Sequence, residues 1–229
     1  MSIHIFHTVN AGLYIYNREQ GILIDGLHLG GGGFSETPAA FLARLFAQEE
    51  ISAGNLALAF THLHEDHYNP ALVRRFLGRY PASGIYLPNP EPQTEQVYFG
   101  DFLLTAFPTV HDGASFKDLP HRSFCLQAEG KQLVICGDGI VDAALAFRMQ
   151  SLCARKTDAV FVNVYQLASS DGCAFLNTLN PDRIFLYHLP FPEDDSCHYR
   201  EMARRIVLQQ SRVLSRPISV PDPMTHIPV

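Results

Sequence analysis

The chain contains 229 residues, 47% of them hydrophobic, which is enough for one sizeable core, and we expect a single domain over residues 1–229. Its formal net charge is −6 and its basic residues are scattered, so the sequence lacks the positive field that would attract nucleic acid. No apolar run reaches the roughly 18 residues that a membrane-spanning helix requires. We therefore expect a small-molecule partner rather than nucleic acid or a membrane, while the oligomeric state stays open.

The five cysteines are widely spaced, are odd in number, and include no Cys-x-x-Cys pair. The opening residues, MSIHIFHTVN, do not have the pattern of a secretory signal peptide. Unpaired thiols are typical of a reducing compartment, so we expect a cytoplasmic location.

The first quarter of the chain alternates strand-like runs with turns. Residues 3–26 predict two or three strands, because β-branched and aromatic residues dominate and NREQG supplies a turn. The glycine run 30–33 predicts a flexible loop at the rim of a cleft, since no Lys-Ser or Lys-Thr pair follows it as in a phosphate loop. A helix is expected over 39–50, after Thr37 and Pro38. Residues 55–60 form a short apolar run, which predicts a buried strand.

The remainder of the chain has the same mixed character. Helical spacing is found over 70–80, 141–155 and 197–211, whereas strand-like runs occupy 84–90, 95–110, 123–130, 131–139, 158–166 and 183–190. The tail 217–229 contains four prolines and is expected to lie extended over the surface. Strand-rich halves with attendant helices predict a layered α/β protein rather than one doubly wound sheet.

The segment THLHEDH, residues 61–67, directly follows the apolar run 55–60. On an extended segment His62 and His64 point to the same side, so both imidazoles can reach one ion at roughly 2.0 to 2.1 Å. Asp66 and His67 follow, and a turn there can aim them at a second ion about 3.5 to 4 Å from the first. We interpret the segment as part of a metal site, the alternative being a polar turn that is rich in histidine.

Further candidate ligands occur where other apolar runs end. These are Asp25 after GILI, His111 after FPTV, Asp138 after LVICG and His188 near the end of RIFLYHLP. Polar groups placed where buried strands emerge at one edge converge on a common cleft. A lone His or Asp at a strand end is also an ordinary surface residue, and Asp25 before glycine is equally suited to fixing a turn.

The motif THLHEDH resembles the His-x-His-x-Asp-His signature of the metallo-β-lactamase superfamily. His111, Asp138 and His188 follow in the order and at the rough intervals of that family's later metal ligands, and ILIDG resembles its early aspartate motif. The residues after the signature, Tyr68, Asn69 and Pro70, replace the glycines of many members. They resemble the branch of small hydrolases related to ascorbate-phosphate lactonase.

The resemblance implies an α/β (α+β layered) fold, an αββα sandwich with two β-sheets face to face and helices outside. It implies two divalent ions, zinc first and manganese or iron as alternatives. One zinc would be held by His62, His64 and His111, the other by Asp66, His67 and His188, with Asp138 between them. Asp25 would orient a ligand rather than touch metal, and Asp66 and Asp138 would take catalytic roles by spreading negative charge and shuttling a proton.

Two departures narrow the family's activities. Position 64 is His rather than the Glu of the diiron flavoprotein oxygen reductases, and no flavodoxin-like domain follows, which argues against oxygen chemistry. No long insertion resembles the added domain of the superfamily's nucleases. The sequence therefore predicts a zinc-dependent hydrolase of a small-molecule ester, lactone or related bond. The alternatives are a metal-dependent phosphodiesterase, a non-catalytic metal-binding or sensing protein of the same fold, and iron redox chemistry.

Substrate contacts are predicted from the segment 114–122, which follows His111. Lys117, His121 and Arg122 would reach over the mouth of the site and hold an anionic group, whereas the simpler interpretation is an exposed loop. Tyr165, in NVYQL after a buried strand, is a further candidate for contacting substrate.

Overall fold

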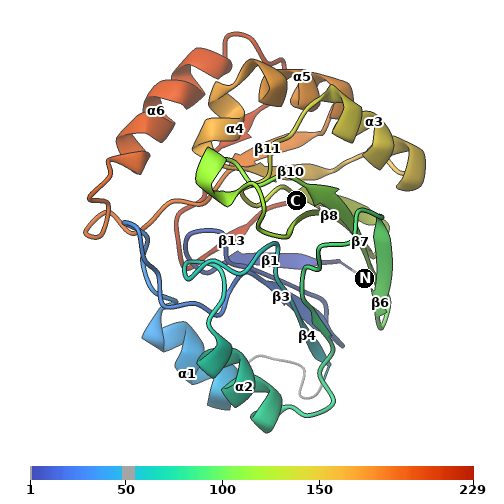
Figure 1. Ribbon diagram of the computed structural model, residues 1–229, viewed down its shortest axis with the longest axis vertical. Helices are drawn as coiled ribbons and strands as arrows, with labels where there is room; N and C mark the ends of the chain where they lie inside the picture. The colour runs from blue at the N-terminus through green and yellow to red at the C-terminus, as the bar shows by residue number, and fades with distance from the viewer. Residues whose placement is uncertain (1, 48–54) are drawn as a thin grey trace.

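The structure is a computed structural model that describes residues 2–47 and 55–229, and it is built on two β-sheets (Figure 1). The first sheet has six strands in the order β13-β1-β2-β3-β4-β5. Strands β1, β2 and β3 form an antiparallel meander, and β3, β4 and β5 run parallel. The strands are β1 (His4–His7), β2 (Leu13–Tyr16), β3 (Gly21–Ile24), β4 (Leu56–Ala59), β5 (Ile85–Tyr86) and β13 (Thr225–Ile227).

The second sheet has seven strands in the order β12-β11-β10-β9-β8-β7-β6. Strands β6 to β9 are antiparallel neighbours, whereas β9, β10, β11 and β12 are parallel. The strands are β6 (Glu95–Phe99), β7 (Phe102–Thr109), β8 (His121–Ala128), β9 (Lys131–Ile135), β10 (Ala159–Val162), β11 (Arg183–Leu186) and β12 (Ile218–Ser219).

Helices cover the outer face of each sheet. One group packs on the first sheet, where Phe41 and Phe76 join the apolar side chains of β3 and β4. The other packs on the second sheet, where Met149 and Phe175 meet β9, β10 and β11. The predicted αββα sandwich is confirmed (Figure 1). The helices are α1 (Ala39–Ala47) and α2 (Pro70–Arg79) on the first sheet, and α3 (Ala143–Leu152), α4 (Val164–Ala168), α5 (Ser170–Leu179) and α6 (Tyr199–Gln210) on the second.

The inner faces of the two sheets form the central core. Side chains such as Ile15 and Ile22 of the first sheet pack in one buried cluster with Phe124 and Phe161 of the second. Because β9, β10 and β11 carry helices on one face and the other sheet on the opposite face, both faces of these strands are buried. This explains why runs such as LVI and AVFV are apolar throughout instead of alternating.

Two expectations about the elements need correction, and one helix was not expected. The strand expected over 158–166 ends at Val162, because Asn163 caps helix α4 in a capping box with Gln166. Helix α5 was not predicted. The tail is not merely a surface extension, since it adds β12 to the second sheet and β13 to the first. Of the helix expected over 39–50, residues 48–50 lie outside the described part of the chain.

Within the described residues, no helix is long and apolar enough to cross a membrane. All five cysteines are free thiols.

Replacing Phe161 by Ala should lower the free energy of unfolding by about 3 to 5 kcal/mol, because the ring is fully buried between the sheets and its loss leaves a cavity. The matched control is Phe147→Ala on α3, where the ring is 61% exposed and the change should stay within about 0.5 kcal/mol. Urea denaturation measures both. Equal midpoints for the two variants would contradict the placement of Phe161 in the central core.

Candidate metal centre

Seven histidine and aspartate side chains meet at one edge of the sandwich, where strands of both sheets end. Strands β4, β7, β9 and β11 each lead within a few residues into one part of this cluster. The local backbone holds the ends in place: Asp112 N donates to Asp138 O at 2.8 Å, and Asn69 N donates to Leu27 O at 2.7 Å. Asn69 also caps α2, with Pro70 in the first turn, so the helix starts as soon as the cluster ends.

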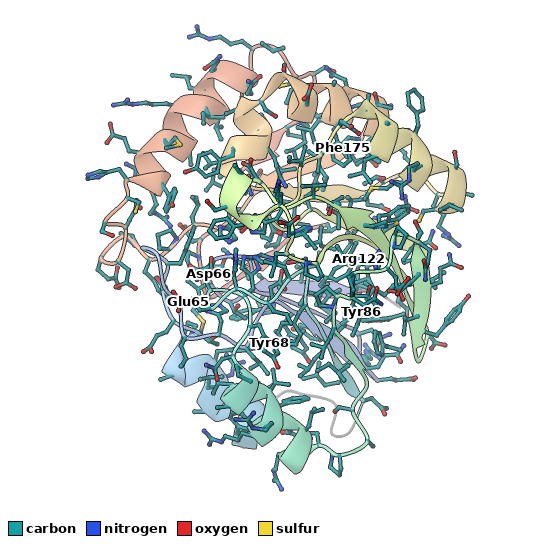
Figure 2. The ribbon with its side chains drawn as sticks, in the orientation of Figure 1. Glu65, Asp66, Tyr68, Tyr86, Arg122 and Phe175 are labelled. Atoms are coloured by element: carbon teal, nitrogen blue, oxygen red, sulfur yellow. The ribbon has the colours of Figure 1, made fainter. Side chains whose placement is uncertain are left out.

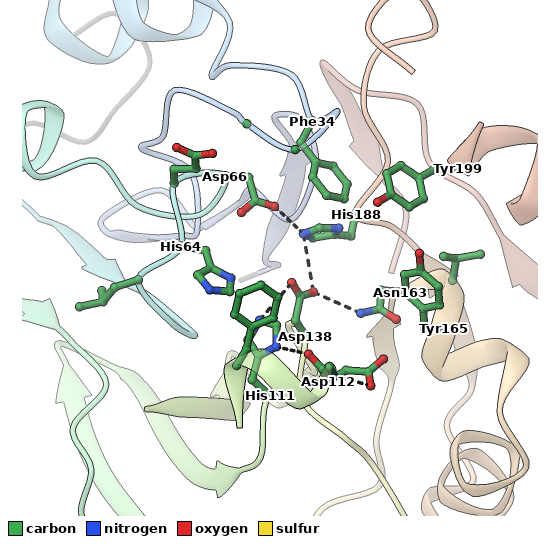
Figure 3. A pocket seen from close by; sticks show the side chains of 17 residues that line it. Phe34, His64, Asp66, His111, Asp112, Asp138, Asn163, Tyr165, His188 and Tyr199 are labelled. Atoms are coloured by element: carbon green, nitrogen blue, oxygen red, sulfur yellow. Dashed lines mark hydrogen bonds and ion pairs between the residues drawn. The ribbon is translucent and has the colours of Figure 1, made fainter. Parts of the chain in front are cut away.

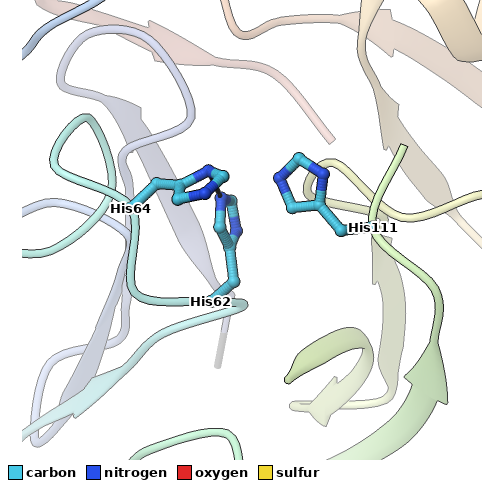
Figure 4. A group of neighbouring side chains, drawn as sticks. All are labelled: His62, His64 and His111. Atoms are coloured by element: carbon cyan, nitrogen blue, oxygen red, sulfur yellow. Dashed lines mark hydrogen bonds between the residues drawn. The ribbon is translucent and has the colours of Figure 1, made fainter. Parts of the chain in front are cut away.

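The first group consists of His62, His64 and His111, which Figure 4 shows pointing toward one another. Each offers one ring nitrogen, and these nitrogens lie within 4.8 Å of one another. His62 Nε2 and His64 Nδ1 are 3.1 Å apart. His111 uses Nδ1 to donate to the carbonyl of Asp112, so its Nε2 is left with a free lone pair, and this buried atom has no hydrogen-bond partner.

The second group consists of Asp66, His67, Asp138 and His188, whose ligand atoms also lie within 4.8 Å of one another. His67 Nε2 and His188 Nε2 are only 2.8 Å apart. Asp66 Oδ2 lies 3.4 Å from His188 Nε2 (Figure 3).

Asp138 lies between the two groups. Its Oδ2 is 3.7 Å from His62 Nε2 and 3.4 Å from His67 Nε2, and its Oδ1 is 3.6 Å from His188 Nε2. One carboxylate therefore faces ring nitrogens of both groups.

Burial and neighbouring charges together shift the pKa values of the buried side chains in the cluster. Burial opposes charge on His67, but Asp66, Asp25 and Asp138 more than offset this and raise its pKa well above the ordinary value. Burial raises the pKa of Asp138, yet His188 and His67 hold it well below its usual range. Around His62, burial lowers the pKa and the neighbouring His67 lowers it further. The carboxylates thus favour a positive charge at His67, whereas burial favours the neutral ring at His62.

Asp25 is fully buried behind His67. Its Oδ2 lies 3.1 Å from His67 Nδ1, and the same carboxylate accepts hydrogen bonds from Thr61 N at 2.8 Å and Thr61 Oγ1 at 2.7 Å. A proton on Nδ1 of His67, donated to Asp25, leaves Nε2 free to face the cluster. The orienting role of Asp25 stays a prediction.

Two non-glycine residues of the site have left-handed backbone conformations. Asp25 has φ +48° and His188 has φ +60°. Such conformations cost about 1 to 3 kcal/mol each, so the surroundings must hold them. Asp25 N donates to Ala59 O at 3.0 Å, and His188 N donates to Asn10 O at 2.9 Å.

The donor set fits divalent ions. Imidazole nitrogens and carboxylate oxygens are the ligands that zinc takes in proteins, and three histidines in one group with a carboxylate-rich second group are enough for two ions. A bound cation would give a partner to the buried Nε2 of His111. It would do the same for the facing Nε2 atoms of His67 and His188. The cluster therefore indicates a divalent metal site.

Two residues that contact Asp138, Asn163 and His121, were not predicted to act there. Asn163 Nδ2 donates to Asp138 Oδ1 at 3.2 Å. His121 Nε2 accepts from Asp138 N at 3.0 Å, so its Nδ1 carries the proton and donates to Thr109 Oγ1 at 2.7 Å. Burial lowers the pKa of His121 to about 3, which keeps this ring neutral. Asn163 follows the apolar run of β10, so the rule that polar groups gather at strand ends would have found it.

The predicted substrate contacts of the 114–122 segment need correction. Arg122 is fully buried, and its guanidinium donates to the carbonyls of Gln93, Asn89 and Glu91, so it ties β8 to a loop (Figure 2). His121 supports Asp138 from behind. Lys117 is exposed and does not line the pocket that the structure describes, whereas Tyr165 does.

A pocket of about 680 Å³ opens over the cluster (Figure 3). The glycine run contributes to its rim, as expected, through Gly31 and Gly32. The other lining residues are Phe34, Leu63, His64, Glu65, Asp66, His111, Asp112, Gly113, Phe116, Asp138, Asn163, Val164, Tyr165, His188 and Tyr199.

The chain was compared with known protein families, curated proteins and solved structures. No protein-family model matches the sequence, and no curated protein matches it. Among solved structures, the fold is similar to CmlA, a diiron β-hydroxylase from Streptomyces venezuelae, with a TM-score of 0.64, 12% identity, and coverage of 100% of this chain and 54% of CmlA. This chain thus spans about half the length of CmlA.

Two further structures match over nearly their whole length. Igni18, a metallo hydrolase from Ignicoccus hospitalis, has a TM-score of 0.64 and 13% identity, with 98% of this chain and 97% of Igni18 covered. The metallo-β-lactamase fold protein YhfI from Bacillus subtilis has a TM-score of 0.58 and 13% identity, with 98% of both chains covered. The chain therefore has the metallo-β-lactamase fold, which confirms at the level of the fold the resemblance seen in THLHEDH.

Gly137 should be intolerant of a side chain, and this tests how tightly the floor of the site is built. It has φ +56°, and a Cβ would lie 2.8 Å from both His121 Nε2 and Thr61 Cβ. Gly137→Ala should lower the free energy of unfolding by about 1 to 3 kcal/mol. Gly78→Ala in α2, where a Cβ meets nothing within 4 Å, should raise it by about 0.5 to 1 kcal/mol. Chemical denaturation compares them, and a Gly137→Ala protein as stable as the wild type would refute this packing.

Proposed function

We propose that this protein is a metal-dependent hydrolase that uses two divalent ions, zinc in first place, to cleave an ester, lactone or related bond of a small molecule. The observation that carries the proposal is the pair of ligand groups sharing Asp138 beneath a pocket large enough for a small substrate. The fold is shared with Igni18, described as a metallo hydrolase. The resemblance to the ascorbate-phosphate lactonase branch stays a prediction.

In this proposal His62, His64 and His111 hold one ion, and Asp66, His67 and His188 the other, with Asp138 between them. When bound, such ions supply Lewis acidity and lower the pKa of water from about 15.7 toward 7. Asp25 keeps the proton of His67 on Nδ1, and Asn163 holds Asp138 Oδ1. The carboxylates of Asp66 and Asp138 spread the negative charge and take up the proton that water loses. The pocket walls orient the substrate and exclude bulk water.

Elemental analysis of the purified protein tests the metal part of the proposal. We expect near two zinc ions per chain, and a lower metal content in His64→Ala. His4→Ala serves as the control, because His4 is an exposed residue of β1 outside the site, and it should keep the wild-type content. Equal occupancy in His64→Ala and wild type would contradict the assignment. Two irons per chain would favour instead the diiron chemistry for which CmlA is described.

The chemical part is tested with the metal-loaded protein on lactones, esters, thioesters and bis(p-nitrophenyl) phosphate. Hydrolysis of a lactone or ester is the expected result, lost on chelation and restored by zinc. A metal-loaded protein that cleaves none of these substrates would favour the non-catalytic metal-binding alternative.

Asp25→Asn should lower kcat/KM about 10- to 100-fold while most of the metal is retained, because the change removes the charge that orients His67 without removing a ligand. The control is Asp182→Asn, since Asp182 pairs with Lys156 on the surface and such pairs contribute little. Steady-state kinetics and metal content are measured on the same preparations. Wild-type kinetics for Asp25→Asn would leave Asp25 only its structural hydrogen bonds with Thr61.

A further inference from the structure

Histidines aside, the charged side chains of the described residues that line the pocket are all acidic. Four carboxylates line it, those of Glu65, Asp66, Asp112 and Asp138. Among the lining residues that the structure describes none is Lys or Arg, and residues 1 and 48–54, which it does not describe, contain neither type in the sequence. If Asp66 and Asp138 are taken up by metal, Glu65 and Asp112 still face the pocket. An anionic group held away from the metals would therefore meet carboxylates and no side-chain cation.

The cations near lining residues in the sequence do not themselves line the pocket. Arg200, next to Tyr199, donates to the carbonyl of Pro190 and pairs with Asp222 at 3.3 Å. Arg122 is enclosed by backbone carbonyls in the interior. Lys117, next to Phe116, does not line the pocket. The contact with an anionic substrate that the sequence suggested has no support in this arrangement.

Aromatic rings line the side of the pocket next to His188. Phe34 packs edge-on against the His188 ring at 4.3 Å between centroids and stacks on Tyr199 at 4.9 Å with an interplanar angle of 10°. Tyr165 stands edge-on to Tyr199 at 6.4 Å (Figure 3). We call Phe34, Tyr165 and Tyr199 the aromatic wall.

The side next to the three histidines is apolar as well. The ring of Phe116 lies 4.6 Å from that of His64 and 5.2 Å from that of His111. Phe116 is nevertheless 46% exposed, and Leu63 and Tyr165 are 40% and 48% exposed. Large apolar side chains left open around a cavity are typical of a surface that a ligand covers.

We propose that the substrate is an uncharged molecule with an aromatic or similarly flat apolar group next to the bond that is cleaved, held between Phe116 and the aromatic wall. This inference rests on the proposed function for its reaction, but it concerns the walls of the pocket, which can be tested without turnover. Flat rings stack favourably on Phe and Tyr, whereas a carboxylate, sulfonate or phosphate on that ring is repelled by Glu65 and Asp112.

Three hydroxamic acids test the walls on the zinc-loaded protein, because the zinc-binding group is the same in each. Benzohydroxamic acid carries a neutral ring, 4-carboxybenzohydroxamic acid adds an anion to that ring, and acetohydroxamic acid lacks the ring. Titration calorimetry should give a dissociation constant for benzohydroxamic acid at least about tenfold lower than for either of the others. Equal or tighter binding of the carboxylated ring, or no gain from the ring, would overturn the proposal.

Substitutions in the pocket walls test where the ring of benzohydroxamic acid binds. Tyr165→Ala and Phe116→Ala should each weaken benzohydroxamic acid about fivefold or more, while acetohydroxamic acid changes less than about twofold, which separates wall contacts from damage to the metal site. Phe147→Ala, an exposed ring on α3 outside the pocket, is the matched control and should change neither. Unchanged benzohydroxamic acid binding in both wall variants would overturn the placement of the ring.

The two proposals fail separately. If the metal-loaded protein hydrolyses nothing while the expected order of hydroxamic acids is found, the hydrolase proposal fails and the pocket inference stands. If the protein hydrolyses a lactone or ester but binds 4-carboxybenzohydroxamic acid more tightly than benzohydroxamic acid, the hydrolase proposal stands and the pocket inference fails. If the chain binds no metal, the hydrolase proposal fails, and acetanilide is offered to the metal-free protein in saturation-transfer NMR. Transfer that is lost in Tyr165→Ala and Phe116→Ala but kept in Phe147→Ala supports the pocket inference, and absence of transfer refutes it.

Discussion

The carboxylate of Asp138 is the interaction on which the site depends, because it faces ring nitrogens from both ligand groups. His62, His67 and His188 lie within 3.4 to 3.7 Å of its oxygens. Imidazoles and carboxylates removed from water are costly unless they are paired or bind a cation. His121 and Asn163 hold Asp138 by its backbone and its side chain, and Gly137 supplies the turn that only a residue without Cβ fits. Much of the local structure therefore serves to keep one carboxylate in place.

What the sequence could predict followed from local patterns. His62, His64 and His67 lie within six positions of each other, so their meeting requires only an extended segment and a turn. Asp138 and His188 were found because apolar runs can be read and polar residues at their ends gather at one edge. The same physics explains the fold, since runs such as AVFV are apolar on both faces only where helices and a second sheet cover them.

What the sequence could not predict depends on distant segments. The sequence neighbours of Arg122 predict a charged loop, but β8 begins at His121 and turns the Arg122 side chain inward to carbonyls of residues 89–93. The aromatic wall is assembled from Phe34, Tyr165 and Tyr199, which come from three separate parts of the chain. Helix α4 replaced the end of an expected strand because the Asn163 and Gln166 caps outweighed the β-branched residues around them.

The pairing of β1 with β13 has a consequence for how the protein comes to be folded. Ile5 lies opposite Ile227, so β1 leaves the ribosome long before its outer partner β13 is synthesised. Until then the outer edge of β1 exposes unpaired backbone groups, which are prone to pair with another chain. The same tail supplies β12 to the other sheet, so its arrival closes an edge on both. Contacts so distant in sequence slow folding, and they make the nascent chain a candidate for chaperone protection during synthesis.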